Sequence, residues 1–102
     1  HPRALACYSE AIKRAPDDPN AYLNCGDMLY VLGQFGDAAH LYESALRLQP
    51  DNPQAWFVLG NCLYQLGLQP GARLAWEQTL RAAPGHPGAM NNLSLIVQPS
   101  AA

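Results

Sequence analysis

Charged residues are scarce in this sequence, and lysine is nearly absent. Only 14% of the 102 residues are charged, the formal net charge is -2, and Lys13 is the one lysine. A protein that binds nucleic acid needs clustered positive charge to neutralise phosphates. We therefore expect no nucleic-acid partner.

Long apolar runs are also lacking. No stretch approaches the roughly 20 apolar residues of a membrane-spanning helix, and no charged segment followed by an apolar one opens the chain. We expect a soluble protein without membrane insertion; the compartment stays open, with the cytoplasm favoured. The start at His1 and the tail at Ser100, Ala101 and Ala102 lead us to expect a fragment of a longer protein.

The residues of catalytic and metal sites are few and dispersed. Cys7, Cys25 and Cys62 form no C-x-x-C pair, so neither a disulfide framework nor a zinc site is indicated, and we expect three buried or half-buried thiols. The histidines stand at positions 1, 40 and 86, and no catalytic triad pattern or glycine-rich phosphate loop occurs. We expect no catalytic residues, no metal and no cofactor, and hence no enzyme.

What the sequence does contain is a repeat with a period of 34 residues. The shift aligns prolines, small residues and aromatic residues: Pro16 with Pro50 and Pro84, Pro19 with Pro53 and Pro87, Ala38 with Ala72, Gly26 with Gly60, Tyr30 with Tyr64, and Gly33 with Gly67. Each P-x-x-P segment is expected to end one helix and begin the next, because proline breaks a helix interior but suits its first position.

Apolar residues between these prolines recur three and four apart, which indicates helices and not strands. Asp18 and Asn52 precede the starting prolines and are expected to cap their helices at about 1 kcal/mol each, while His86 is a poorer cap. The expected helices span residues 3–14, 20–32, 37–48, 54–66, 71–82 and 88–97.

The residues at these aligned positions resemble the tetratricopeptide repeat (TPR) family. The matches are Tyr22, Gly26, Gly33, Ala38, Tyr42, Ala45 and Pro50 in one unit, and Trp56, Leu59, Gly60, Gly67, Ala72, Trp76 and Pro84 in the next. Thr79 departs from the pattern where Ala45 follows it. The small residues are expected to let paired helices approach closely, with Tyr22, Trp56, Tyr42 and Trp76 filling the core around them.

The resemblance implies an all-α fold: a right-handed superhelical stack of antiparallel helix hairpins, with about six helices in a single domain over residues 1–102. Residues 1–18 would be the second helix of a partial repeat, 19–52 and 53–86 two full repeats, and 87–102 the first helix of a partial repeat. Proteins of this kind bind partners on an extended concave surface. We therefore expect a protein-protein interaction scaffold that binds a peptide segment.

The first helix of each repeat is expected to line that concave groove. Spacings of three and four place ten candidate residues on one face of these helices: Asn20, Leu23, Asp27, Tyr30, Gln54, Phe57, Asn61, Tyr64, Asn91 and Leu95. An alternative for Leu23 and Phe57 is that they pack between adjacent repeats, and Tyr30 and Tyr64 could simply face solvent.

This candidate groove carries Asp27 and no lysine or arginine. Some co-chaperones of the family clamp the terminal carboxylate of a chaperone tail with basic residues, and here such a carboxylate would be repelled. We therefore expect a neutral or mildly basic peptide partner.

Three further expectations concern the wider context. The apolar terminal helices predict self-association, because the last helix of one molecule could complete a repeat with the first helix of another. Alternatively, the chain is a substrate-presenting arm of a larger enzyme, such as a glycosyltransferase or methyltransferase, with Asn24, Asn61, Asn91 and Asn92 as an asparagine set. A secretion or pilus-assembly chaperone is the remaining alternative.

Overall fold

A computed structural model describes residue 13 and residues 17–96, the side chain of Ile96 excepted. These residues form five α-helices and no strand: α2 (Pro19–Val31), α3 (Phe35–Leu48), α4 (Pro53–Gln65), α5 (Gln69–Ala82) and α6 (Pro87–Ile96). The predicted all-α class is confirmed, and the expected helix at 3–14 lies, apart from residue 13, outside the described residues. No described helix has the length and apolar character needed to cross a membrane.

Three of the helices begin at a proline, one residue before the predicted start. Pro19, Pro53 and Pro87 are the first residues of α2, α4 and α6, because proline's fixed φ and missing amide proton suit that position. The side chain of Asp18 accepts from the amide of Asn20 at 2.9 Å. The two predicted proline-linked caps are thus confirmed, since the Asn52 carboxamide oxygen likewise accepts from the backbone amides of α4, at 3.0 and 3.2 Å.

His86 also caps its helix, although it is a weaker capping residue by type. Its ring Nδ1 accepts from the backbone amide of Ala89 at 3.1 Å. The ring lies with its centroid 4.6 Å from that of Phe57. The contact with Phe57 therefore holds the capping imidazole at the start of α6.

The turn inside each hairpin is made by a glycine in the left-handed region. Gly33 has φ +81° and Gly67 has φ +80°, a conformation that side chains with a Cβ rarely adopt. After this reversal α3 and α5 begin at Phe35 and Gln69, two residues earlier than predicted.

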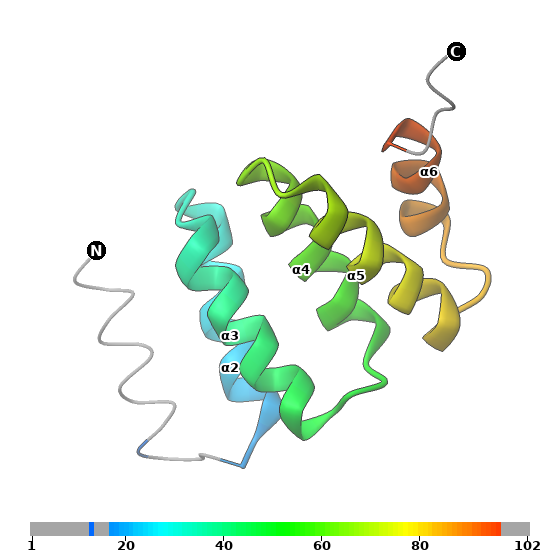
Figure 1. Ribbon diagram of the computed structural model, residues 1–102. Coiled ribbons are helices and arrows are strands. Elements are labelled where there is room, and N and C mark those ends of the chain that lie inside the picture. The colour runs from blue at the N-terminus through cyan, green and yellow to red at the C-terminus, as the bar shows by residue number, and fades with distance from the viewer. Residues whose placement is uncertain (1–12, 14–16, 97–102) are drawn as a thin grey trace.

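Consecutive helices pack against each other, so that α2–α3 and α4–α5 form two hairpins and α6 packs on α5. Figure 1 shows the hairpins side by side, with α6 at the far end of the stack. Small residues set the distance within each hairpin. A Cβ on Gly26 would lie 3.0 Å from Tyr42 Cζ, and one on Gly60 would lie 2.5 Å from Trp76 Cδ1.

The core runs from one hairpin into the next. Tyr42, Leu41 and Leu29 of the first hairpin belong to the same buried cluster as Leu59 and Cys62 of the second. Each hairpin buries its second helix against the next repeat, which is how stacked repeats share a continuous core. A smaller cluster of Ala72, Trp76 and Ala89 joins α5 to α6.

The aromatic core residues behave largely as predicted. Tyr22, Tyr42 and Trp76 are buried. Trp56 is half-buried: it packs against the first cluster, and its Nε1–H donates to the Pro50 carbonyl oxygen at 2.7 Å. This tryptophan therefore fastens the loop before α4 as well as filling the core.

One prediction about the cysteines is wrong. Cys62 is a buried free thiol, as expected. Cys25, which was expected to be a thiol, is disulfide-bonded. Its sequence spacing gave no sign of this, because a disulfide depends on which segments the fold brings within a few ångströms.

Candidate functional site

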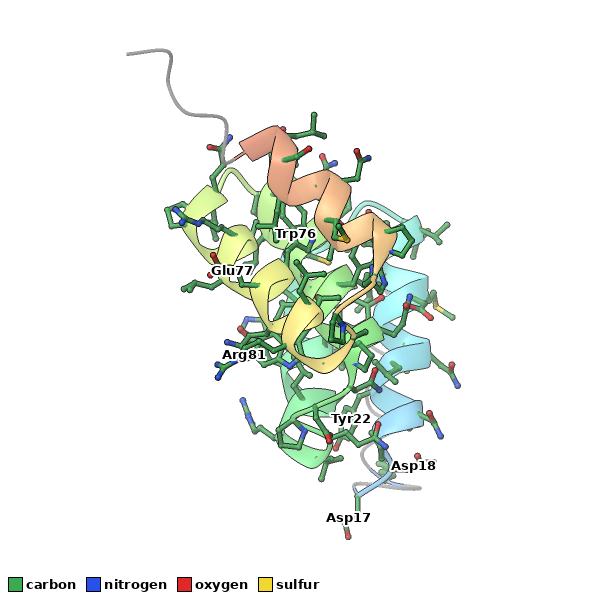
Figure 2. The ribbon with its side chains drawn as sticks, turned by 90° about the vertical axis from the view of Figure 1, so that its right-hand side faces the viewer. Asp17, Asp18, Tyr22, Trp76, Glu77 and Arg81 are labelled. Carbon is green, nitrogen blue, oxygen red and sulfur yellow. The ribbon has the colours of Figure 1, made fainter. Side chains whose placement is uncertain are left out.

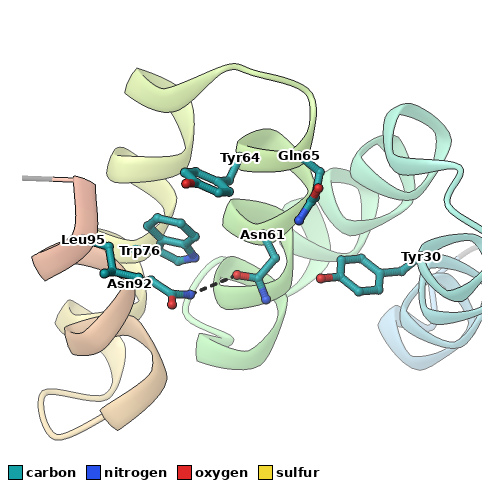
Figure 3. A pocket seen from close by; sticks show the side chains of 7 residues that line it. All are labelled: Tyr30, Asn61, Tyr64, Gln65, Trp76, Asn92 and Leu95. Atoms are coloured by element: carbon teal, nitrogen blue, oxygen red, sulfur yellow. Dashed lines mark hydrogen bonds between the residues drawn. The ribbon is translucent and has the colours of Figure 1, made fainter.

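A hollow of about 290 Å³ opens on the side of the stack formed by α2, α4 and α6, with one wall from α5. Figure 3 shows Tyr30 on one side, Asn92 and Leu95 on the other, and Asn61 between them. We call it the groove pocket; its lining residues are Tyr30, Asn61, Tyr64, Gln65, Trp76, Asn92 and Leu95.

Four of the ten predicted groove residues line this pocket: Tyr30, Asn61, Tyr64 and Leu95. They come from three different helices, and those on neighbouring groove helices are 31 or 34 residues apart. Their convergence therefore follows from the stacking of repeats. Their role in binding a partner stays a prediction.

Three lining residues were missed by the sequence reasoning. Trp76 was assigned to the core, and at 2% exposure it is a core residue whose edge also closes the pocket. Asn92 was noticed only as part of an asparagine set, and Gln65 stands at the end of α4. Asn92 is adjacent in sequence to the candidate Asn91. The rotation of α6 about its axis decides which of the two asparagines lines the pocket.

The other predicted residues lie outside the pocket. Leu23 is half-buried and packs against the first core cluster. Phe57 packs on α6, where a Cβ at Gly88 would come within 2.7 Å of its ring. The contact of Phe57 favours the alternative that this side chain packs between repeats. The remaining four are exposed: Asn20, Asp27, Gln54 and Asn91.

A pair of carboxamides spans the centre of the pocket. Asn92 Nδ2 donates to Asn61 Oδ1 at 3.2 Å, which joins α6 to α4 (Figure 3). Among the described residues nothing else bonds to the side chains of this pair. Both N–H donors of Asn61 Nδ2, and the second N–H and the carbonyl oxygen of Asn92, remain available. A peptide backbone offers the complementary acceptor and donor.

Aromatic rings border this carboxamide pair. The centroids of Tyr64 and Trp76 lie 5.8 Å apart, and Tyr64 is 42% exposed. The Trp76 Nε1–H is used internally, since it donates to the Phe57 carbonyl oxygen at 3.2 Å. Tyr30 packs edge-on against Phe35, and burial, followed by the negative charge of an ionised Cys62, raises the pKa of its phenol. The pocket thus offers apolar ring surface and neutral polar groups.

Charge is distributed unequally between the two kinds of helix. The groove helices α2, α4 and α6 carry Asp27 and no other aspartate, glutamate, lysine, arginine or histidine. The outer helices α3 and α5 carry charges of both signs, including an Arg73–Glu77 pair at 3.3 Å. Figure 2 shows Glu77 and Arg81 on the outer side of α5, away from Trp76.

Asp27 is held in place by the core of the first hairpin. The buried Tyr42 hydroxyl donates to Asp27 Oδ1. Burial, then this hydrogen bond and the carboxylate charge, strongly raise the pKa of the Tyr42 phenol, which therefore stays protonated. Burial and the Asp27 charge likewise raise the pKa of the Cys62 thiol on α4 to about 12. The carboxylate is therefore bonded to α3, and its charge acts on the thiol of α4.

Metal chemistry receives no support from the described part of the chain. No group of three or more histidine, cysteine, aspartate or glutamate side chains there could hold a metal ion. What the site offers chemically is hydrogen bonding, ring contacts and one negative charge.

Comparison with known families gives a match over most of the chain. The sequence model of a family described as "Tetratricopeptide repeat" matches residues 1–35 and 26–87. No curated protein matches the chain significantly.

Solved structures with the same fold are numerous, and three are informative. The first TPR of Spaghetti (RPAP3) bound to the HSP90 peptide SRMEEVD has a TM-score of 0.86 and 23% identity, over 92% of this chain and 75% of its own. MamA has a TM-score of 0.81 and 21% identity. The match covers 83% of this chain and 50% of MamA.

The third structure is the Yersinia enterocolitica type III secretion chaperone SycD in complex with a peptide of the translocator YopD. Its TM-score is 0.80 at 19% identity, over 87% of this chain and 73% of its own. At these identities the likeness shows the fold alone, and it confirms the predicted α-solenoid of helix hairpins.

Proposed function

We propose that this chain, which belongs to the tetratricopeptide repeat family, is a non-catalytic interaction module. It binds an extended peptide segment of a partner protein in the groove pocket. The carboxamide pair carries this proposal. Asn61 and Asn92 leave amide N–H donors and a carbonyl acceptor at the centre of a hollow bordered by exposed ring surface. An extended backbone with an apolar side chain satisfies both features.

The structural neighbours support this choice of ligand class. The RPAP3 domain and SycD are both described as bound to peptides. We keep the domain division proposed from the sequence, with full repeats at 19–52 and 53–86 and partial repeats at 1–18 and 87–102. In that division both full repeats and the last partial one contribute side chains to the pocket.

Charge favours a neutral or mildly basic peptide. The RPAP3 ligand SRMEEVD ends in acidic residues, whereas the groove helices here carry one aspartate and no cation. An acidic tail would lose its water contacts without gaining a charge-assisted hydrogen bond. We therefore propose that an acidic chaperone tail is not the ligand of this chain.

The two alternative roles, an arm that presents substrates to an enzyme and a secretion chaperone, use the same groove and differ in the identity of the ligand. Self-association through the two apolar terminal helices that the sequence predicts is a separate proposal. It predicts a mass that rises with concentration in analytical ultracentrifugation, and a constant monomer mass would contradict it.

Selection of peptides from a displayed library of random dodecapeptides tests the proposal. Binding is followed by fluorescence in a Trp56→Phe background, which leaves Trp76 at the pocket as the one tryptophan of the chain. We expect selected peptides to shift its emission. The double variant Asn61→Ala, Asn92→Ala removes both partners of one hydrogen bond, so no buried group is stranded, and we expect about tenfold weaker binding.

The matched control is Leu74→Ala, on a side chain of α5 that is 61% exposed and does not line the groove pocket. It should bind the selected peptides as the wild type does. Failure to select any peptide, or equal binding by the asparagine double variant with an unchanged circular dichroism spectrum, would overturn the proposed function.

A further inference from the structure

One column of the repeat changes its chemistry along the groove. Asp27, Asn61 and Leu95 stand 34 residues apart and so occupy the same position in successive first helices. This column runs from a carboxylate on α2, through a carboxamide on α4, to an aliphatic side chain on α6. A peptide lying along the stack meets these three groups in order.

The carboxylate end is built to attract a cation. Asp27 is exposed, and among the described residues it has a hydrogen bond from Tyr42 and no ion pair. A phenol donor fixes the carboxylate without neutralising it, so less side-chain freedom is lost when a ligand binds. No positively charged side chain on α2, α4 or α6 competes for this charge.

The opposite end is apolar. Leu95 lines the groove pocket and is 63% exposed. No charged residue occurs anywhere on α6. An aliphatic side chain of a ligand would remove this leucine surface from water, whereas a charged one would be desolvated there without a partner.

We propose that the groove binds its peptide in one polarity. A lysine or arginine side chain lies beside Asp27, the main chain bonds to the Asn61–Asn92 pair, and an aliphatic side chain contacts Leu95. This inference rests on the proposed function, and it adds the chemical order of the ligand.

A positional-scanning library of decapeptides tests the order directly. Each sublibrary fixes lysine, glutamate, glutamine or leucine at one position and randomises the others. We expect the wild type to prefer lysine over glutamate near one end of the peptide only, by about threefold to fivefold as for an exposed ion pair. Leucine should be preferred near the other end only.

Two substitutions should separate these preferences. Asp27→Asn keeps an oxygen that accepts from Tyr42 and removes the charge, so it should abolish the lysine preference and leave the leucine preference intact. Leu95→Gln should do the reverse. Asp51→Asn, in the exposed turn before α4, removes the same charge elsewhere and should change neither.

Tyr42→Phe is the second control, because it removes the hydroxyl donor but retains the carboxylate. It should keep a lysine preference. The inference is overturned if lysine is favoured equally at all positions, if Asp51→Asn acts as strongly as Asp27→Asn, or if both preferences survive Asp27→Asn and Leu95→Gln. Those results leave peptide binding intact, whereas an absence of binding to every sublibrary would defeat the proposed function and this inference together.

Discussion

The two hairpins share one 34-residue repeat, yet each closes around its central glycine in its own way. In α2–α3 the Tyr42 ring packs against Gly26, and its hydroxyl donates to Asp27 on the groove side. In α4–α5 the Trp76 indole packs against Gly60, and its Nε1–H donates to a backbone carbonyl of α4 at 3.2 Å.

The difference has a functional consequence. The first hairpin uses its core aromatic residue to hold a groove side chain, whereas the second uses a backbone acceptor. Asn61, which occupies the position of Asp27 in the second repeat, is therefore free to bond to Asn92 of α6. A repeat thus determines where a residue stands, and the residue type there determines what it bonds to.

The largest expected difference between the hairpins concerns their glycines. We expect Gly60→Ala to destabilise the protein by about 2 kcal/mol, because the new Cβ would lie 2.5 Å from Trp76 Cδ1 and that ring cannot retreat. Gly26→Ala should cost less than about 1 kcal/mol, since its Cβ is 3.0 Å from Tyr42 Cζ and alanine favours the helix. Urea unfolding monitored by circular dichroism measures both; equal costs would contradict the difference in packing.

Removal of the Tyr42 hydroxyl should have the next largest effect. We expect Tyr42→Phe to lower the free energy of unfolding by about 1.5 kcal/mol, the lower end of the usual net contribution of a hydrogen bond to a charged group. A double-mutant cycle with Asp27→Ala isolates the pair. A coupling energy near zero in that cycle would show that the core of the first hairpin does not support the groove side chain.

The helix caps should contribute in a similar range, with a smaller contrast. Asn52 accepts from two amides and Asp18 from one. We expect Asn52→Ala to cost about 1 kcal/mol and Asp18→Ala somewhat less. Thermal unfolding of the two variants in the same buffer makes the comparison, and a larger loss at Asp18 would reverse the ranking.

The smallest expected effect is a dependence on alkaline pH. Cys62 is buried, with its pKa raised from 9.0 to about 12, whereas Met28 at the same repeat position is 41% exposed. Above pH 9 the unfolded thiol loses its proton before the folded one, so the folded state binds more protons and stability falls as pH rises toward 12. The loss at pH 9.0 should be about 0.4 kcal/mol.

Urea titrations between pH 7 and 9 measure this slope, and Cys62→Ala is the control. The variant should be less stable throughout but show a flatter profile. An identical slope in both proteins would assign the alkaline sensitivity to other groups.

Much of the fold was predictable because its signals are local. The prolines at 19, 53 and 87 locate helix starts to within one residue, and Gly33 and Gly67 locate the turns. Gly36 and Pro70 are typical loop residues and so predict later starts for α3 and α5. Both are nevertheless compatible with the first turn of a helix, where the structure has them. The disulfide at Cys25 had no local signal.

The candidate site was only partly predictable. The helical period placed Tyr30, Asn61, Tyr64 and Leu95 on the groove side. The helical period did not predict that Phe57 packs on α6. An apolar residue on the groove side fits the same pattern whether a ligand or a neighbouring helix contacts it. The helical period also could not place Asn92, because that depends on the rotation of α6 about its axis.

The sequence by itself determined the helices, their order and the close approach at Gly26 and Gly60, because proline geometry, helical period and side-chain size act over a few residues or within one hairpin. Only the tertiary structure decided which polar groups of different repeats meet. The Asn61–Asn92 bond depends on the distance and rotation between two helices, and those are set by the packing of all the side chains that separate them.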